Sequence, residues 1–320
     1  MPYNSIISRV DAADLIPTET SLEIIKEIPQ SSVVMQFGRP LPNLSRKQRR
    51  IPVVSLLPTA YFVSPGAGAE TDIKQTTEQN WSGVDLVAEE LAVIVPIPEA
   101  VLDDSEFDMW GEVKPSLVEA FGIAFDQAVL YGTNAPNSWP DDLLTQATAA
   151  GNILALGAGG VDLYDDLLGV SGVIAKLEAD GYIPSGHIAA TSMRGKLRGT
   201  RDAQGQPIFK PAGGNGARFA YELDGAPITF PTNGAVAPAT SLLISGDWQR
   251  LRYALRQDIT FKVLTEAVIQ DGTGAIIYNL AQQDMVALRA VLRVGWVLPN
   301  PVNRIEPTAA NRCAFAFLTP

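Results

Sequence analysis

The sequence contains a single cysteine, Cys313, and a single histidine, His187. One cysteine cannot form a disulfide within the chain, and one residue of each type leaves no Cys/His set for a structural zinc site. Any metal chemistry would therefore depend on carboxylates. No apolar run approaches the roughly 20 residues that cross a bilayer, and the N-terminus lacks the pattern of a signal peptide. We therefore expect a soluble cytoplasmic product with an intact N-terminus and no membrane partner.

Charge is also sparse, since charged residues make up 18% of the 320 residues and hydrophobic ones 46%. A chain whose whole surface faced water would carry more charge, so part of this surface is expected to face other protein. The net charge of −11 argues against a protein whose main task is gripping phosphate backbones, and contact with nucleic acid should be weak. The length predicts one large domain or two intertwined domains.

The N-terminal 40 residues are predicted to form an arm with one short helix, at residues 18–27 between two prolines. Residues 51–63 are rich in β-branched and aromatic residues and predict a strand. A glycine-containing tip at 64–70 and a return through 71–97 complete a long two-stranded hairpin. An isolated hairpin is marginally stable in water, so this one requires a partner surface, which another subunit could supply.

A long helix is predicted after this hairpin, because apolar residues recur by threes and fours from Phe107 to Ala128. About 26 residues, ending at Gly132, would make a helix of roughly 39 Å. Pro115 lies inside the pattern and predicts a bend, and Gly111 removes a side chain at the turn that the proline disturbs.

The adjacent acids Asp103 and Asp104 precede this helix and could be mistaken for a catalytic carboxylate pair. Working pairs converge on one bond, whereas adjacent side chains usually diverge. We expect Asp104 or Ser105 to be the N-cap of the helix, with the other acids favouring the positive end of its dipole. The pair then marks the boundary between a strand and the helix.

The middle of the chain predicts a second helix that begins at Asp162 and stops at Gly181. One apolar stripe runs along it, formed by Leu163, Leu167, Val170, Ile174 and Leu177. Short strands are expected at 187–191, 226–231 and 241–245, and the chain returns through strand-like segments at 284–298 and 313–318.

Other candidate sites are weak. The glycine-rich segments 157–160 and 213–218 lack the residues that follow a phosphate-binding loop and are predicted to be turns. His187 lies in an apolar strand and should be buried or at an interface. The basic clusters at 45–50 and 193–201 could contact nucleic acid or form salt bridges, and the second is the more common explanation. We assign no catalytic, cofactor-binding or metal-binding residue.

Four stretches, in order, resemble segments of the tailed-bacteriophage major capsid proteins of the Hong Kong 97 type. These are "LAVIVPIPEAVLDDSEFD" (91–108), "AFDQAVLYGTNAPNSWP" (124–140), "LRGTRDAQGQPIF" (197–209) and "LLISGDWQRLRYALRQDITFKVL" (242–264). They are similar to the family's strand into the spine helix, the end of that helix, its "LR.LKD..G.P" pattern and its "GDF" segment. The resemblance extends over nearly the whole chain.

The resemblance implies an α+β capsid fold. It divides the chain into an N-terminal arm (1–50), an extended loop (51–90), a peripheral domain with the spine helix (91–135 and 281–320) and an axial domain (136–280). Copies would assemble as pentamers and hexamers into an icosahedral shell around phage DNA, with a portal, a separate scaffolding protein and decoration proteins as further partners. The chain would not be an enzyme and would need no cofactor.

Two alternatives stay open at this point. One is an encapsulin-like nanocompartment shell, and the other is an enzyme that uses clustered acids such as Asp103, Asp165 and Asp166. Some family members also weld subunits through an isopeptide bond between a lysine and an asparagine, assisted by a glutamate. Lys74, with Asn300 or Asn303 and Glu306, could supply such a set. We do not expect this crosslink, because the part of the return strand where the family's lysine would be expected, residues 79–87, contains no lysine.

Overall fold

A computed structural model of the chain describes residues 32–60, 76–104, 108–160, 162–201, 204–206, 208–209 and 221–320. The predicted helix at 18–27, the predicted tip of the hairpin and Lys74 lie outside these residues. Among the residues described, no helix combines the length and the apolar character that a membrane crossing needs.

A four-stranded sheet forms one half of the body, with the strand order β1-β10-β13-β4. Its strands are β1 (Arg39–Pro40), β10 (Arg252–Leu264), β13 (Met285–Val297) and β4 (Glu89–Pro98). The long helix α3 (Met109–Tyr131) covers one face. Every second residue of β13 points to that face, as the period of a strand requires, so that Leu288, Ala290, Leu292, Val294 and Trp296 pack in one cluster with Leu117, Phe121 and Phe125.

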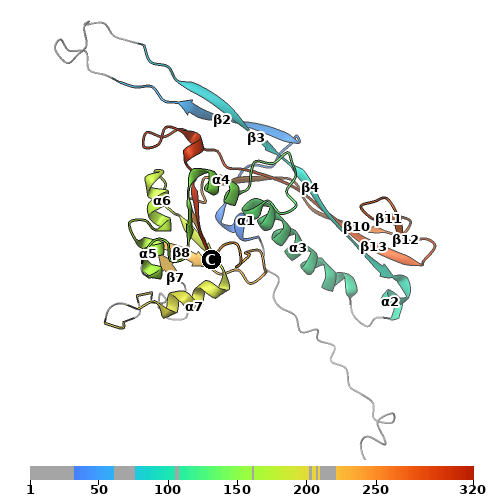
Figure 1. The fold of residues 1–320 in the computed structure, drawn as a ribbon. Helices are drawn as coiled ribbons and strands as arrows, with labels where there is room; N and C mark the ends of the chain where they lie inside the picture. The colour runs from blue at the N-terminus through green and yellow to red at the C-terminus, as the bar shows by residue number, and fades with distance from the viewer. Residues whose placement is uncertain are drawn as a thin grey trace, which may run out of the picture.

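A six-stranded sheet forms the other half, in the order β5-β14-β9-β6-β8-β7. Its strands are β5 (Ile153–Ala155), β14 (Phe315–Thr319), β9 (Leu243–Gly246), β6 (Gly186–Ala189), β8 (Ala226–Thr229) and β7 (Tyr221–Leu223). Phe315 and Phe317 of β14 join the cluster beneath α3 and α4 (Leu143–Ala150), whereas Ala316 and Leu318 join a second cluster. That cluster lies under α5 (Leu163–Leu168), α6 (Val173–Ala179) and α7 (Thr191–Gly199). This sheet is therefore a middle layer (Figure 1).

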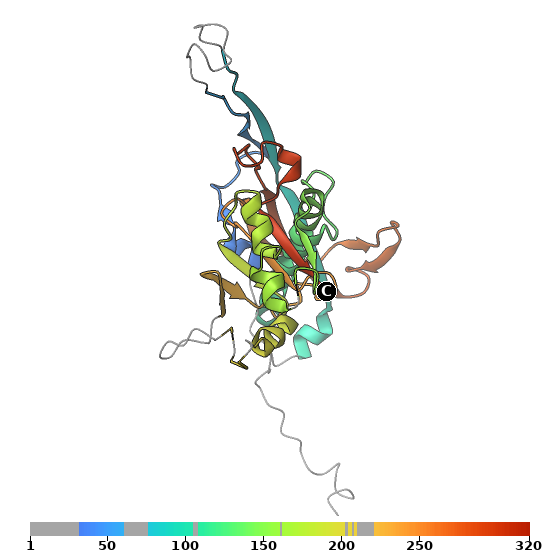
Figure 2. The ribbon, with the colours of Figure 1, turned by 60° about the vertical axis from the view of Figure 1, so that its left-hand side comes forward.

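Two hairpins leave the body, as the turned view in Figure 2 shows. The longer one pairs β2 (Gln48–Leu56) with β3 (Asn80–Val87), and the shorter one pairs β11 (Val268–Gln270) with β12 (Ile276–Asn279). The remaining elements are the short helices α1 (Val33–Phe37), α2 (Glu99–Asp104) and η2 (Ala309–Asn311). The predicted returning strand and closing strand are confirmed as β13 and β14. The predicted hairpin is confirmed in part as β2–β3, but its return was predicted too long, because β3 ends at Val87 and Glu89–Pro98 form β4 of the four-stranded sheet.

The predicted start of the long helix was wrong. Helix α3 has 23 residues and its N-cap is Asp108, whose carboxylate accepts a hydrogen bond from the backbone N–H of Gly111 at 3.0 Å. Asp103 and Asp104 instead end the separate helix α2, which begins directly after Pro98 ends strand β4. Proline has no backbone N–H to donate to a sheet, so Pro98 explains locally why the strand ends and a helix begins at this position. The helix does stop at Gly132, which has φ of 68°.

The predicted second helix is two helices, α5 and α6, separated by Gly169 and Gly172. At both glycines a Cβ atom would lie within 3 Å of the Asp165 carbonyl oxygen, so the chain turns too tightly for another residue type. The predicted stripe is correct at Leu167 and Ile174, which are buried, but Val170 lies between the helices and is 98% exposed.

Several elements were not predicted, namely helices α4 and α7, the 13-residue strand β10 and the hairpin β11–β12. Strand β10 lies within the range predicted for the axial domain, yet it pairs with β13 in the four-stranded sheet. Strand β14 lies within the range predicted for the peripheral domain, yet it pairs with β9 in the six-stranded sheet. Long-range pairing of this kind leaves no trace in local periodicity.

Candidate assembly surfaces and buried polar sites

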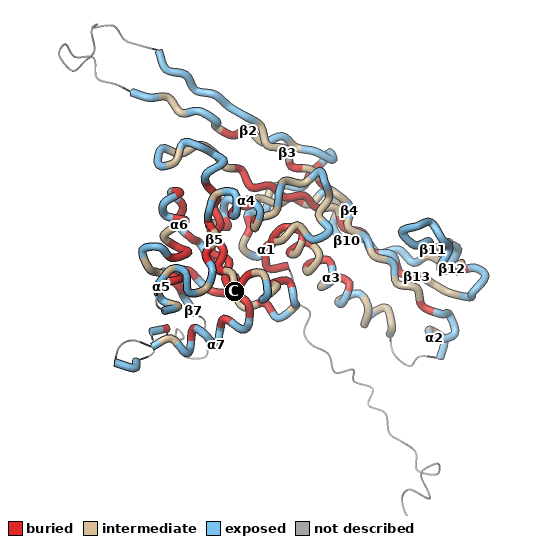
Figure 3. Tube along the Cα trace, viewed as in Figure 1, coloured by how far each residue is buried: buried red, intermediate tan, exposed pale blue. Residues whose placement is uncertain are grey.

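The hairpin β2–β3 extends from the body with both faces largely exposed (Figure 3). Trp81 is 65% exposed and Leu56 is 42% exposed, although both are large apolar side chains. Only Val53 of β2 and Leu86 of β3 are buried. Full burial of an apolar side chain of this size contributes roughly 1.5–3 kcal/mol of stabilising free energy. The hairpin would therefore be stabilised by a surface that covers these side chains.

The base of the hairpin is held firmly. Leu86 packs in a small cluster with Leu44, Ala254 and Val297. At Gly295 of β13, a Cβ atom would lie 2.3 Å from the carbonyl oxygen of Val87, so the two strands approach as closely as glycine allows. The C-terminal loop adds a hydrogen bond from the N–H of residue 302 to the Val54 carbonyl, and another from Arg304 to the Pro58 carbonyl.

The first basic cluster, at 45–50, lies at this base and forms contacts within the chain. Lys47 pairs with Glu89 at 2.9 Å, and Arg50 lies 4.0 Å from Asp85. Hydrogen bonds from Ser138 and Lys47 hold the pKa of Glu89 below its ordinary value. The salt-bridging explanation of this cluster therefore holds, with partners in the same chain.

Asp126, in helix α3, is fully buried and holds the segment that begins at Ser32. Its carboxylate accepts hydrogen bonds from the Ser32 hydroxyl at 2.5 Å and from the backbone N–H groups of Val33 at 2.8 Å and Val34 at 3.1 Å. The Ser32 hydroxyl also accepts a hydrogen bond from the N–H of Met35 and so caps α1. Burial raises the pKa of Asp126 to about 6, against the effect of these hydrogen bonds. This anchor holds Ser32, Val33 and Val34 against helix α3.

His187 is fully buried in β6, as predicted. Its Nε2 atom donates to the Leu223 carbonyl at 3.0 Å, and burial lowers its pKa to about 4, so the ring is neutral at pH 7. Ser245 lies opposite in the pairing register of β9, but neither its hydroxyl nor His187 Nδ1 has a hydrogen-bond partner among the described residues. The hydrogen bond that joins a nucleophile to its base is therefore not formed between these two side chains.

The acids considered for an enzyme site do not come together. Asp103 lies in α2, on the opposite side of the body from α5, which contains Asp165 and Asp166 (Figure 1). The Asp166 carboxylate accepts hydrogen bonds from the backbone N–H groups of Gly157 at 2.7 Å and Gly159 at 2.8 Å. The segment 157–160 is thus a turn held by a carboxylate. Within the described ranges, no group of three or more acidic, histidine or cysteine side chains could hold a metal ion.

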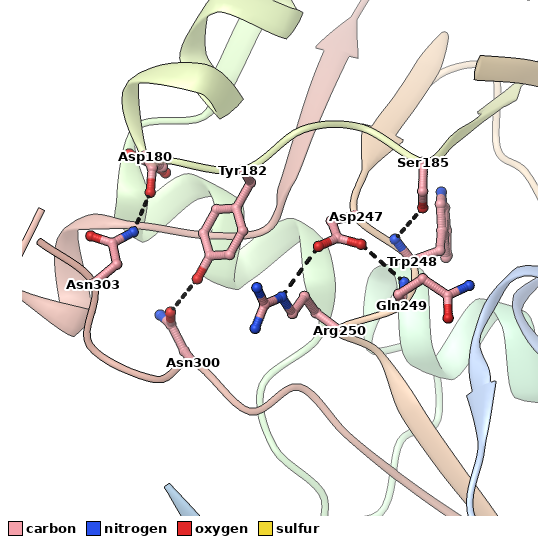
Figure 4. Close-up of polar contacts among 9 residues, drawn as sticks. All are labelled: Asp180, Tyr182, Ser185, Asp247, Trp248, Gln249, Arg250, Asn300 and Asn303. Atoms are coloured by element: carbon pink, nitrogen blue, oxygen red, sulfur yellow. Dashed lines mark hydrogen bonds and ion pairs between the residues drawn. The ribbon is translucent and has the colours of Figure 1, made fainter. Parts of the chain in front are cut away.

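The two asparagines considered for a crosslink are both occupied by local hydrogen bonds (Figure 4). Asn300 accepts from the Tyr182 hydroxyl at 2.8 Å and donates to the carbonyl groups of residues 309 and 312. Asn303 donates to the Asp180 carbonyl at 2.7 Å and accepts from the N–H groups of residues 305 and 306. Both amides therefore shape the C-terminal loop.

One cavity, which is partly open to solvent, was not predicted. It measures about 210 Å³ and lies between β4, α3 and the loop after Gly132, with Phe125 and Trp139 among its apolar walls. Its two carboxylates are both engaged, since Glu89 pairs with Lys47 and Glu90 pairs with Arg293 at 2.7 Å. The cavity offers no free charged group for chemistry.

Comparison with known proteins agrees with this geometry. The model of the phage capsid family matches residues 12–305. The major capsid protein of Staphylococcus phage 80alpha is 28% identical over 281 residues, which are 86% of this chain and 79% of that protein. A probable major capsid protein of Mycobacterium phage D29 is 24% identical over 85% of this chain and 82% of its own length.

Solved structures extend the likeness over the whole chain. A chain from Microbacterium phage Oxtober96 superposes with a TM-score of 0.82 and 35% identity, covering 99% of this chain and all of that one. A chain from Mycobacterium phage Adephagia has the same TM-score and 33% identity, with 99% and 98% covered. These likenesses favour a phage shell over a nanocompartment or a carboxylate-dependent enzyme. The chain therefore belongs to the phage capsid family, and its function is that of a major capsid protein of tailed phages.

Proposed function

We propose that copies of this chain self-assemble as pentamers and hexamers into an icosahedral shell, in the cytoplasm of the host bacterium, around double-stranded phage DNA. The observation that carries the proposal is the hairpin β2–β3, which exposes Trp81 and Leu56 although its base packs against the body. A two-stranded hairpin needs a third surface for stability. A second copy of the chain supplies that surface when the hairpin lies across its neighbour.

We propose a domain division that follows the two sheets. The arm (1–50), the extended loop (51–90) and the peripheral and axial domains keep the predicted order. Strand β10 belongs with the peripheral sheet and β14 with the axial sheet, because hydrogen-bonded strands move as one body.

We propose that the shell is held without covalent crosslinks and that the chain is not an enzyme. The amide groups of Asn300 and Asn303 are committed to the C-terminal loop, which leaves neither poised for attack by a neighbouring lysine. Denaturing electrophoresis of mature particles should show a single band at the monomer, and a ladder above it would contradict this proposal.

The assembly proposal can be tested with Trp81→Ala combined with Leu56→Ala. Both side chains are exposed in the single chain, so the free energy of unfolding should stay within about 0.5 kcal/mol of the wild type. Electron microscopy should nevertheless show that shells fail to form. The matched control is Val170→Ala, which truncates an exposed apolar residue on the axial half.

Shells of normal size from the hairpin variant would overturn the role of the hairpin. A wild-type chain that stays monomeric with a co-expressed scaffolding protein would overturn the shell itself. The scaffolding protein, the portal and decoration proteins are predictions, and correct-size shells from the chain expressed alone would count against a separate scaffold.

A further inference from the structure

Helix α7 carries the second basic cluster, and its environment differs from that of the first. The segment 191–201 contains four basic residues and no acidic residue, in a chain whose net charge is −11. Met193 and Leu197 are buried and hold the helix against the axial core. Lys196, Arg198 and Arg201 are exposed, and none of the three has an ion-pair partner among the described residues. The cations at 45–50, by contrast, include two that face acids of the same chain.

The outer face of α7 is also open and free of apolar side chains. A Cβ atom at Gly195 or Gly199 would meet no atom within 4 Å, so a partner can approach the helix closely beside Lys196 and Arg198. Figure 3 shows this exposed face at the margin of the molecule. Protein-binding surfaces are centred on buried aromatic and aliphatic anchors, and this face has none. A phosphate backbone requires cations, hydrogen-bond donors and close approach, and no apolar anchor.

Two simpler explanations account for only part of the cluster. Lys196 and Arg198 lie in the last turn of α7, where a cation stabilises the helix dipole. That effect fades within one turn and gives no reason for Arg201, which lies beyond the helix. Two acids, Asp162 and Asp166, share a hollow of about 560 Å³ with Lys196 and Arg201. They offset part of the positive charge, which keeps any affinity for a polyanion low.

We propose that the outer face of α7, with Arg201, is a contact surface for the phosphate backbone of double-stranded DNA, without sequence preference. This goes beyond enclosure of DNA by a shell, because it assigns the contact to one helix and orients that helix toward the packaged genome. Three cations predict a slope of about −3 when the logarithm of the binding constant is plotted against the logarithm of the salt concentration. Binding of this kind is weak enough to let DNA slide during packaging and ejection.

The test uses the unassembled full-length chain and a fluorescent duplex of about 30 base pairs, with binding followed by anisotropy between about 20 and 150 mM salt. The wild type should give the slope of about −3, and Lys196→Gln with Arg198→Gln should reduce its magnitude by about 2. The matched control, Arg46→Gln with Arg50→Gln, makes the same change of charge on the hairpin base and should leave the slope unchanged.

Three results would overturn the proposal. The first is that the chain does not bind the duplex even at the lowest salt. The second is that both double variants weaken binding equally. The third is that poly-glutamate binds in preference to DNA. The last outcome would identify an acidic protein as the partner. If the double variant unfolds, Lys196→Gln alone should still reduce the magnitude of the slope by about 1. Because assembly plays no part in the measurement, its outcome is independent of the proposed shell.

Discussion

The two sheets of this protein differ in how far their faces are covered by other parts of the chain. The six-stranded sheet is covered on both faces, so that neighbouring residues of β14, Phe317 and Leu318, are both fully buried in separate clusters. The four-stranded sheet is covered by α3 on one face, and the base of the hairpin β2–β3 covers only part of the other, where Leu86 packs against Ala254 and Val297. Its other face exposes Ile94, which is 41% exposed and lies across the strands from Arg289, and Arg289 in turn lies beside Lys262. One sheet is complete within the chain, and the other has a face that is covered only in part.

This difference suggests a division of roles, in which the six-stranded sheet mainly determines the stability of the fold and the four-stranded sheet with its hairpins mainly determines assembly. Exposed apolar side chains of the four-stranded sheet and its neighbouring hairpins include Ile276 at 63% and Trp81 at 65%, whereas those of the other half include residues of connecting segments, such as Val170 at 98% and Ile183 at 76%. The single chain leaves Ile276 and Trp81 open, so we expect neighbouring copies to bury them. The half built on the six-stranded sheet should therefore respond to mutation as an ordinary core, and mutations in the half built on the four-stranded sheet should affect assembly.

The largest effect is expected from Phe317→Ala in the six-stranded sheet. Phe317 is fully buried, and truncation of a buried phenylalanine costs about 3–5 kcal/mol through lost burial and a new cavity. Urea unfolding of the unassembled chain should report this loss. A loss below about 1 kcal/mol would mean that the six-stranded sheet is not the complete core described above.

The next effect concerns pH, because His187 and Asp126 are buried groups with pKa values shifted in the acidic range, and the two act in opposite directions. His187 has a pKa of about 4 when folded, below its ordinary value of 6.5, so its contribution to stability is lost as the pH falls from 6.5 to 4. Asp126 has a pKa of about 6 when folded, above its ordinary value of 3.8, so stability is gained as the pH falls from 6 to 3.8. Each effect amounts to roughly 3 kcal/mol and the two nearly cancel.

Single variants should separate these two contributions. With His187→Gln, the unfolding free energy relative to the wild type should rise between pH 6.5 and 4, and with Asp126→Asn it should fall. Urea unfolding at pH 7 and pH 4.5 would measure both. Parallel pH dependence of the two variants would show that these groups are not the ones that titrate.

A loss of about 2 kcal/mol is expected from Asp126→Ala, because the backbone N–H groups of Val33 and Val34 lose their acceptor. Hydrogen exchange should then quicken at these two amides while the core of α3 stays protected. Asp166→Ala is the matched control, since Asp166 is also buried and also accepts two backbone hydrogen bonds. Unchanged protection at Val33 and Val34 would argue against Asp126 as the anchor of the arm.

A smaller loss, about 1 kcal/mol, is expected from Asp108→Ala, which removes the cap of α3. Asp104→Ala serves as the control, because Asp104 ends α2 and caps nothing in α3. Thermal unfolding would distinguish the two. Equal losses from both variants would place the start of the long helix nearer to the position predicted from the sequence.

The smallest change in unfolding free energy, at most about 0.5 kcal/mol, is expected from Ile94→Ala on the open face of the four-stranded sheet. The effect should instead appear as a lower yield of shells in electron microscopy. A large loss of stability in the unassembled chain would show that this face is buried within the chain, and the contrast between the two sheets would fail.

Strong local signals predicted much of the fold correctly. The alternating apolar residues of β13 and the helix stop at Gly132 lie where the sequence placed them, and His187 is buried as expected. Prediction failed where two local signals competed. Asp104 and Asp108 are both plausible caps, and the choice between them depends on α2, a helix too short to show a period. The interruption at Gly169 was missed because the apolar spacing continued across it.

The candidate surfaces were only partly visible in the sequence. The need of the hairpin for a partner follows from its length and composition, and both basic clusters stand out in the printed sequence. The two clusters differ in their surroundings. Lys47 forms an ion pair with Glu89, whereas α7 has exposed cations and glycines with no neighbouring atoms. This difference is visible only in the tertiary structure. The role of Asp126 also needed the structure, because its partners lie more than 90 residues away.

The sequence by itself determined the class of protein, the long helix, the projecting hairpin and the absence of disulfides within the chain, because these depend on composition and on neighbours within a few turns. The tertiary structure alone decided which strands share a sheet, which carboxylates accept hydrogen bonds from backbone N–H groups and which faces remain exposed. Those outcomes depend on contacts between distant residues, whose energies no local pattern records.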